Sequence, residues 1–301
     1  MSLAKKVKTA LDETRLLILG AQVLFGFQLN GVFQEAFADL SHSTRLLSCL
    51  GQFLMTLSVA LLVAPSMQHR IVEGGDDSNR IHRTTTIYAG WALLPFEISL
   101  GIGAYEVFDH LYGRWVAFVM GTVFCLLAGF FWFGLEAVVK FSMGEKGMRE
   151  AEKPAPLSTK IEQMLTEARV ILPGAQALLG FQLTVTLARS FEQLSEPVKL
   201  VHVAALCCVG FTVILLMTPA ALHRISFAGE DTPAFFRLGS GFVIAAPAFL
   251  AFGIAGDLFV ATYRAAGSQD LALVVAVAST VLLALFWFAI PLYIRRGYRA
   301  K

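Results

Sequence analysis

The chain contains eight long runs of apolar residues, and these limit what it can fold into more than any other feature. A helix that crosses the hydrocarbon core of a bilayer needs roughly 20 mostly apolar residues. The runs cover residues 16–37, 46–66, 84–108, 115–139, 168–191, 198–222, 237–262 and 270–293. Only 15% of the residues are charged, against roughly 25% in soluble domains. We therefore predict an all-α integral membrane protein with eight transmembrane helices.

Lys and Arg are distributed unevenly between the two ends of these predicted helices. Of the 24 basic residues, only five lie on the side away from the termini: Arg45, Arg114, Arg189, Lys199 and Arg264. Cytoplasmic loops carry an excess of Lys and Arg. This predicts a multi-pass protein of the cytoplasmic (inner) membrane with both termini in the cytoplasm. Its partner is then the lipid bilayer, and a net charge of +2 gives no reason to expect nucleic acid.

The two halves of the sequence repeat each other at an offset of 154 residues. Residues 20–29 (Gly-Ala-Gln-Val-Leu-Phe-Gly-Phe-Gln-Leu) match residues 174–183 (Gly-Ala-Gln-Ala-Leu-Leu-Gly-Phe-Gln-Leu). Towards the end of each copy, a Phe-Trp-Phe sequence at 131–133 matches the one at 286–288, at an offset of 155. Ser78 and Thr232 match as well, and both are typical helix N-caps.

Each copy holds an even number of predicted spans, so both copies enter the membrane from the same side. Such repeats are parallel and are related by an axis along the membrane normal. We expect a rotation of about a half-turn, as in an ancestral dimer of four-helix subunits. The predicted boundaries are 1–145 for the first four-helix repeat, 146–160 for a cytoplasmic linker and 161–301 for the second repeat.

These motifs resemble a bacterial family of small four-span membrane proteins, catalogued as domain of unknown function 6328. The resemblance rests on Glu13-Thr-Arg15, Gln22, Gly26-Phe27, Ala64-Pro65 and His69-Arg70, and in the second copy on Glu167, Arg169, Gln176, Gly180-Phe181, Pro219 and His223-Arg224. Thr218 departs from the pattern, because the first copy has Ala64 there. Typical members resemble one copy, so this chain looks like a tandem duplication. Some members carry the label sodium/proton antiporter, which implies ion movement.

The sequence contains none of the motifs expected of a hydrolase, a zinc enzyme or a nucleotide-driven pump. It has no His-Glu-x-x-His, no Gly-x-Ser-x-Gly and no Walker loop. The four cysteines, Cys49, Cys125, Cys207 and Cys208, lie in apolar runs without zinc-ligand spacing. We expect no enzymatic activity, no cofactor and no metal site.

Glu97 is the leading candidate for ion chemistry, because it lies near the middle of the run 84–108. An ionised carboxylate at that depth costs several kcal/mol, so it usually faces a cavity or a partner. Two interpretations stay open: a proton or cation site, or a protonated carboxyl bonded to a neighbouring helix. Aligning Pro95 with Pro247 sets Phe249 opposite Glu97, so such a site would be asymmetric.

Four glutamines recur at matching positions of the two copies: Gln22, Gln28, Gln176 and Gln182. By their depth, Gln28 and Gln182 are expected near the middle of the membrane. Buried amides can hold helices together by hydrogen bonds. They are therefore interpreted either as polar contacts between the repeats or as the lining of a pore on the symmetry axis.

Charged residues also recur where the first two spans of each copy meet the cytoplasm. They are Glu13, Arg15, His69 and Arg70, and in the second copy Glu167, Arg169, His223 and Arg224. Adjacent antiparallel helices bring these groups to one depth. We predict ion pairs within each copy, from Glu13 to His69 or Arg70 and from Glu167 to His223 or Arg224. A phosphate or anionic-lipid site is the alternative.

A weaker set contains Asp257 in the seventh run and Glu106, Asp109 and His110 at the outer end of the third. We interpret these as solvated charges near loops, with Asp257 kept as a further proton or cation candidate. The leading functional hypothesis is movement of small cations or protons through a polar seam between the repeats. The rival is a membrane scaffold, sensor or lipid-binding module, and a homo-oligomer stays open for either.

Overall fold

The computed structural model describes residues 3–76, 78–134, 156–225, 227 and 230–299, and every regular element within them is helical. The first half contains α1 (Leu3–Gly31), η1 (Glu35–Asp39), α2 (His42–Ile71), α3 (Asn79–Tyr112), α4 (Arg114–Gly129) and η2 (Phe130–Gly134). The second half contains α6 (Leu157–Val185), α7 (Arg189–Glu192), α8 (Glu196–Ile225), α9 (Pro233–Ala266), α10 (Gln269–Ala284), η3 (Leu285–Ala289) and α11 (Ile290–Arg299). The all-α prediction is confirmed for these residues.

Six of the described helices are long and apolar enough to cross a membrane, as expected of a multi-pass membrane protein. Two shorter apolar helices, Leu17–Gly31 and Arg114–Gly129, occupy the places of the first and fourth predicted spans. The predicted runs 16–37 and 168–191 are too long, because α1 ends at Gly31 and α6 at Val185. Their remaining apolar residues form short helices whose phenylalanines, Phe37 and Phe191, are buried against the bundle.

The two repeats keep the same local contacts at the predicted offset. Ser78 and Thr232 cap α3 and α9 as expected, each accepting a backbone N–H at 3.1 Å. Ser58 donates to the carbonyl of Ala92, and Thr212 donates to that of Ala246. Because the offset of 154 holds along the whole of α3 and α9, Ala251 is the residue opposite Glu97. The proline alignment, which paired Phe249 with Glu97, is therefore displaced by two residues.

Each repeat also contains a π-helix at its Phe-Trp-Phe sequence, η2 in the first and η3 in the second. The offset becomes 155 before these elements, because Ser268 is an extra residue that caps α10. Trp287 of η3 is fully buried and donates to the carbonyl of Ala60 in α2 at 3.0 Å. The π-turn therefore helps join the second repeat to the first.

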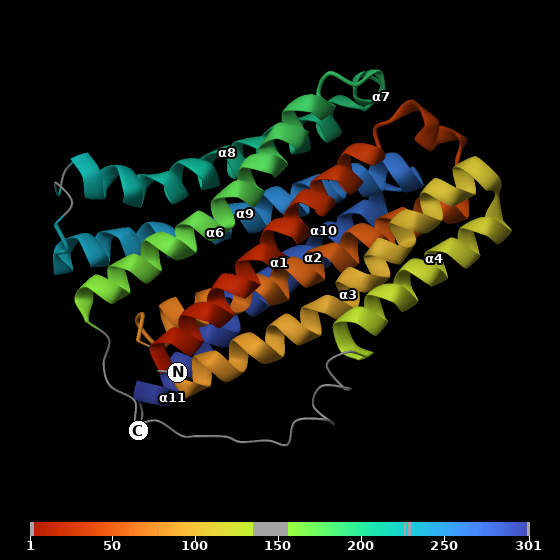
Figure 1. Cartoon of the computed structure of the whole chain (residues 1–301). Coiled ribbons are helices and arrows are strands. Elements are labelled where there is room, and N and C mark those ends of the chain that lie inside the picture. Colours follow the sequence, from red (N-terminus) through yellow and green to blue (C-terminus); the bar gives the residue numbers. More distant parts are fainter. Residues whose placement is uncertain (1–2, 77, 135–155, 226, 228–229, 300–301) are drawn as a thin grey trace.

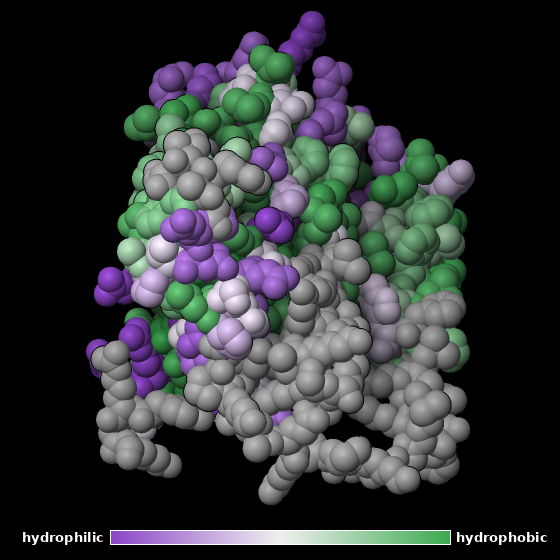
Figure 2. Space-filling model, turned by 60° about the vertical axis from the view of Figure 1, so that its left-hand side comes forward, coloured by the Kyte–Doolittle hydropathy of each residue, from purple (hydrophilic) through white to green (hydrophobic). Residues whose placement is uncertain are grey.

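The repeats run in the same direction. Figure 1 shows α1 and α6 side by side, both beginning at the left-hand end, which we call the terminal end because the chain termini lie there. The rings of Phe27 and Phe181, at equivalent positions, lie 4.8 Å apart. Figure 2 turns the terminal end towards the viewer, and hydrophilic side chains gather across it while hydrophobic ones cover the flank at the right.

The packing between the repeats does not have the reciprocity of a two-fold axis. Helix α2 packs against α9, α10, η3 and α11 of the second repeat. Its counterpart α8 makes no comparable contact with α3 or α4 within the described part of the chain. A half-turn would produce each inter-repeat contact twice. The expected half-turn relation is therefore not what this packing follows.

Candidate functional site

The most unusual buried acid is Asp257, on α9. The sequence suggested that Asp257 is a solvated charge near a loop. In the structure, however, the residue is only 5% exposed. At roughly 1.5 Å per residue, Asp257 lies about 11 Å past the midpoint of α9, inside the roughly 15 Å half-thickness of a bilayer core centred on that helix. An acid at this depth needs polar partners.

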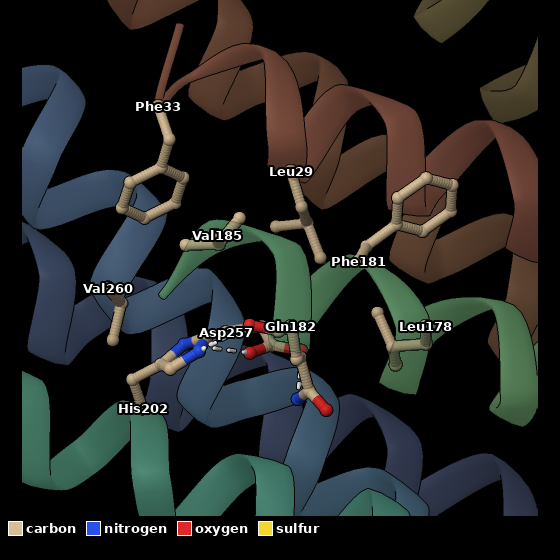
Figure 3. A pocket seen from close by; sticks show the side chains of 9 residues that line it. All are labelled: Leu29, Phe33, Leu178, Phe181, Gln182, Val185, His202, Asp257 and Val260. Atoms are coloured by element: carbon tan, nitrogen blue, oxygen red, sulfur yellow. Dashed lines mark hydrogen bonds and ion pairs between the residues drawn. The ribbon is translucent and has the colours of Figure 1, made fainter. Parts of the chain in front are cut away.

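Two side chains from neighbouring helices provide those partners (Figure 3). The Gln182 amide on α6 donates from Nε2 to Oδ2 of Asp257 at 2.7 Å. The His202 imidazole on α8 turns Nδ1 towards Oδ1 of Asp257 at 3.8 Å. Gln182 and His202 are only 2% and 3% exposed, so the three groups form a closed cluster. Of the three, only His202 was not singled out from the sequence.

The local sequence explains how these groups come together. Gly253 and Gly256 of α9 face α8, where an added Cβ at Gly256 would lie 2.8 Å from the Cβ of Ala205. The two helices can therefore approach closely. Gln182 is in the last turn of α6 rather than at mid-membrane, and carbonyls there have no partner within their own helix. Its carbonyl oxygen instead lies 3.1 Å from Nε2 of His202.

A small cavity of about 20 Å³ adjoins the cluster, enough for about one water molecule. Apolar side chains line the rest of it: Leu29, Phe33, Leu178, Phe181, Val185 and Val260. Leu29 comes from the last turns of α1 and Phe33 from the turn that follows it, so both repeats close the cavity (Figure 3).

The hydrogen bonds define the protonation chemistry of the cluster. A carbonyl oxygen only accepts, so Nε2 of His202 carries a proton, and Nδ1 of the neutral imidazole is then a lone pair. This lone pair and an ionised Asp257 oxygen face each other as two acceptors. Either a proton on one of them or a small cation between them would relieve the conflict. The cluster can therefore bind and release one positive charge.

The first repeat does not reproduce the cluster. Gln28, the counterpart of Gln182, donates to Oγ of Ser99 at 2.9 Å, and Ser99 donates to the carbonyl of Gly51. Gly103 and Ser48 stand where the second repeat has Asp257 and His202. The site is therefore built in one repeat only.

Glu97 lies elsewhere, between α3 and α4. The Cys125 thiol donates to its Oε1 at 3.6 Å, and a Cβ on Gly129 would lie 2.7 Å from the same oxygen. Its Oε2 is buried and has no hydrogen-bond partner within the described part of the chain. The structure therefore does not bring Glu97 together with Gln28 or Gln182.

The four glutamines are also separated. Gln22 is buried where α1 meets α6, and a side chain at Gly174 would collide with it. Gln176, its counterpart, is exposed. With Gln28 and Gln182 in different networks, the four amides do not line one seam, which corrects that interpretation. The one-sided packing of the repeats explains why equivalent amides have different surroundings.

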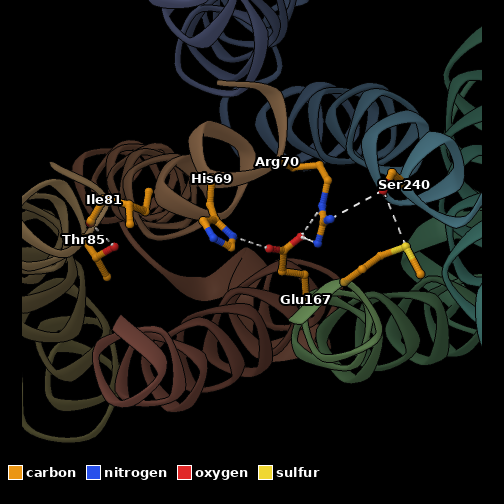
Figure 4. Close-up of polar contacts among 7 residues, drawn as sticks. His69, Arg70, Ile81, Thr85, Glu167 and Ser240 are labelled. Atoms are coloured by element: carbon orange, nitrogen blue, oxygen red, sulfur yellow. Dashed lines mark hydrogen bonds and ion pairs between the residues drawn. The ribbon is translucent and has the colours of Figure 1, made fainter. Parts of the chain in front are cut away.

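A second polar cluster joins the repeats near the terminal end (Figure 4). Oε1 of Glu167 lies 2.8 Å from Nδ1 of His69, and Oε2 accepts from Nε and Nη2 of Arg70 at 2.9 and 2.7 Å. The expected pairing of Glu167 within its own repeat is thus replaced by pairing across the repeats, because α6 packs on α1 and α2 at this depth. His223 instead faces Asp231 at 3.4 Å.

Several predicted charges remain outside this cluster. Arg169 is exposed and lines an open groove between α6 and α8. The side chains of Glu13, Arg15 and Arg224 lie outside the described part of the chain, so the pairing predicted for Glu13 concerns residues beyond it.

The outer acids are less solvated than predicted. Asp109 is half-buried and accepts from the Thr44 hydroxyl at 2.6 Å, and Glu106 is half-buried too. Both lie against α2, which shields them from solvent. His110 is exposed. Among the described residues, no group of three or more His, Cys, Asp and Glu side chains could hold a metal ion.

Comparison with known proteins agrees with the repeat. The sequence model described as "Family of unknown function (DUF6328)" matches residues 2–136 and again residues 153–291. The two matches confirm the resemblance and its tandem form. No curated protein and no solved structure matches the chain.

Proposed function

The chain belongs to the DUF6328 family, and we propose that this member moves protons or a small cation across a membrane by way of Asp257, His202 and Gln182. The observation that supports this proposal is a buried carboxyl–imidazole pair, 3.8 Å apart, whose two groups come from two apolar helices that are each long enough to span a bilayer. Both groups can gain or lose a proton, and the Gln182 amide holds the carboxyl in place.

The proposed cycle exchanges a proton for a cation, or passes the proton on. In the loaded state, a proton is held by Asp257 or by Nδ1 of His202. Loss of that proton leaves two acceptors facing each other in an apolar cavity, a state that favours either reprotonation or entry of a cation. Buried apolar residues, Leu178, Leu250 and Ile254, separate the site from the terminal end. Access from that side therefore requires the helices to move, as in alternating access.

We propose that the chain crosses the membrane eight times. The apolar part of α1 supplies the first, and α4 with its continuation η2 supplies the fourth. Together, Arg114–Gly129 and Phe130–Gly134 extend for roughly 30 Å at 1.5 Å per residue, which is the thickness of the hydrocarbon core. We propose the inner membrane with cytoplasmic termini, because Lys and Arg gather at the terminal end. We propose no enzymatic reaction and no cofactor for this protein.

A labelling experiment tests the orientation. In a chain without its native cysteines, Gln193→Cys lies in an exposed turn at the end opposite the termini, and Glu230→Cys lies in an exposed turn at the terminal end. We expect an impermeant maleimide to label Gln193→Cys in intact cells and Glu230→Cys only after lysis. The reverse pattern would overturn the orientation.

Flux into liposomes tests the function itself. Purified protein is reconstituted with a pH-sensitive dye inside, and an outward proton gradient is imposed with and without external Na⁺ or K⁺. We expect dye responses above those of empty liposomes. Responses equal to those of empty liposomes with every cation would reject transport.

The alternative function is a non-transporting membrane scaffold, sensor or lipid-binding module. The observation in its favour is the packed first-repeat layer, where Gln28 donates to Ser99 and Ser99 donates to the carbonyl of Gly51 between neighbouring helices. An absence of flux in a folded protein would favour this alternative.

A further inference from the structure

Equivalent helices of the two repeats are buried to very different extents. In the apolar part of α2, 67% of the residues are buried inside the protein, against 33% in the apolar part of its counterpart α8. For α9 the share is 61%, against 28% for α3. Helices that share sequence motifs and local contacts should have similar needs for partners. The difference arises because α2 and α9 pack against each other at the centre, whereas α8 and α3 lie at the two sides.

The contact between the repeats is therefore heterologous. The α2 face of the first repeat meets the α9–α10–η3 face of the second, where Trp287 donates to the carbonyl of Ala60 and Arg70 donates to the Ser240 hydroxyl at 3.4 Å. Each repeat carries both kinds of face. One of each remains unused: the α8 face of the second repeat and the α3–α4–η2 face of the first.

The unused faces expose apolar side chains at positions equivalent to those of the used faces. Thr86, the counterpart of Ser240, lines an open groove of about 710 Å³ with Trp91, Leu94 and Phe133. On α8, the side chains matching the buried face of α2 are exposed, including Val203 at 49% and Ile214 at 60%. Helices α3 and η2 are the counterparts of α9 and η3. The groove therefore corresponds to the place where α2 packs against α9 and η3.

We propose that a second copy of this chain docks its α3–α4–η2 face on α8, repeating the contact that joins the two repeats within one chain. Heterologous contacts form a ring when the rotation between neighbours closes, and a shared membrane plane prevents the translation that would produce a helical filament. The drive is close packing of complementary helix faces, since lipid tails cover apolar surface equally well. The protein is therefore a cyclic homo-oligomer, in which each repeat has a neighbour on both sides.

The sequence keeps residues for this second contact. Glu13 matches Glu167, and His223-Arg224 matches His69-Arg70. Within one chain, the glutamate of the second repeat binds the His-Arg pair of the first. The same relation between copies would use the glutamate of the first repeat and the His-Arg pair of the second. One ion cluster per interface explains why both copies retain all three residues.

A cysteine cross-link gives a sharp test because the internal interface supplies the template. Cys49 of α2 lies near Thr262 on α9. The matching positions for the intermolecular contact are Val203 on α8 and Phe108 on α3. We avoid the Trp287 contact as a template, since Ile214 is bulkier than its counterpart Ala60. In a chain whose native cysteines are replaced by alanine, Val203→Cys with Phe108→Cys is oxidised in membranes.

We expect a ladder of disulfide-linked species on non-reducing gels that stops at the size of the ring. Thr262→Cys with native Cys49 is the matched positive control, and it should form a bond within one chain. Leu187→Cys with Phe108→Cys, which pairs an exposed residue off the α8 face with the same partner, should remain monomeric.

The mass of the wild-type protein in nanodiscs provides a second measurement that needs no substitution. An oligomeric mass with the ladder supports the proposal. A monomeric mass overturns it, whatever the cross-link shows. An oligomeric mass without the ladder, while the Cys49 control forms, overturns the docking of α8 on α3.

Discussion

Asp257→Asn is expected to reduce pH-driven flux in liposomes to the level of empty vesicles. The asparagine keeps the shape of the side chain and can still accept the Gln182 amide hydrogen that Asp257 accepts at 2.7 Å. It cannot release a proton, and it removes the negative charge that a cation would need. Because Asp257 is 5% exposed, removing a buried charge should not weaken folding, and the yield of monodisperse protein checks this.

Glu97→Gln is the matched control, since it neutralises another acid within an apolar helix. Glu97 faces α4 and Cys125 rather than the Asp257 cavity, so flux should remain close to that of the wild type. Loss of flux in Glu97→Gln together with full flux in Asp257→Asn would move the site to Glu97 and reject the proposal. Flux equal to that of the wild type in both variants would reject both sites.

His202→Gln should give an intermediate result if His202 shares the proton. A glutamine amide can still donate towards the Gln182 carbonyl, but it has no titratable nitrogen to face Asp257. The pH at which flux is half-maximal should therefore change while some flux remains. An unchanged pH profile would limit His202 to packing.

The repeat could be read from the sequence, but the asymmetry that creates the site was harder to see. Hydrophobic runs and matched motifs predicted helices, caps and copies, because these depend on local pattern. Asp257 and His202 stand where the first copy has Gly103 and Ser48. The available signal in the sequence was an acid and a histidine that lie in apolar runs and have no counterpart in the other copy. Glu97 attracted more weight because depth along a run says nothing about which helix a side chain faces.

The sequence also could not distinguish pairing within a repeat from pairing across repeats. Glu167 has identical candidate partners in both copies, and only the placement of α6 beside α2 selects His69 and Arg70. The prediction that the four glutamines line one seam was wrong for the same reason. Gln22 and Gln176 lie in closely similar local sequences, whereas the heterologous packing gives them different neighbours.

Glu167→Gln is expected to cause the largest loss of stability of any single substitution proposed for the described residues. Glu167 is 3% exposed and accepts two charge-assisted bonds from Arg70, which is itself 4% exposed. Among the described residues, the guanidinium then keeps the Ser240 hydroxyl at 3.4 Å and the Phe236 ring at 5.6 Å. Leaving one partner of a buried ion pair uncompensated costs about 3–5 kcal/mol. Reversible unfolding in mixed micelles measures the free energy.

Two further variants separate this cause from a general effect of the substitution. Glu196→Gln makes the same change in an exposed pair, where Glu196 lies 2.9 Å from Lys199, and should cost less than about 1 kcal/mol. Arg70→Met added to Glu167→Gln removes the orphaned charge, so the double variant should be more stable than Glu167→Gln alone. If the second substitution instead lowers stability further, the loss comes from packing, and the ion cluster does not hold the repeats together through its charge.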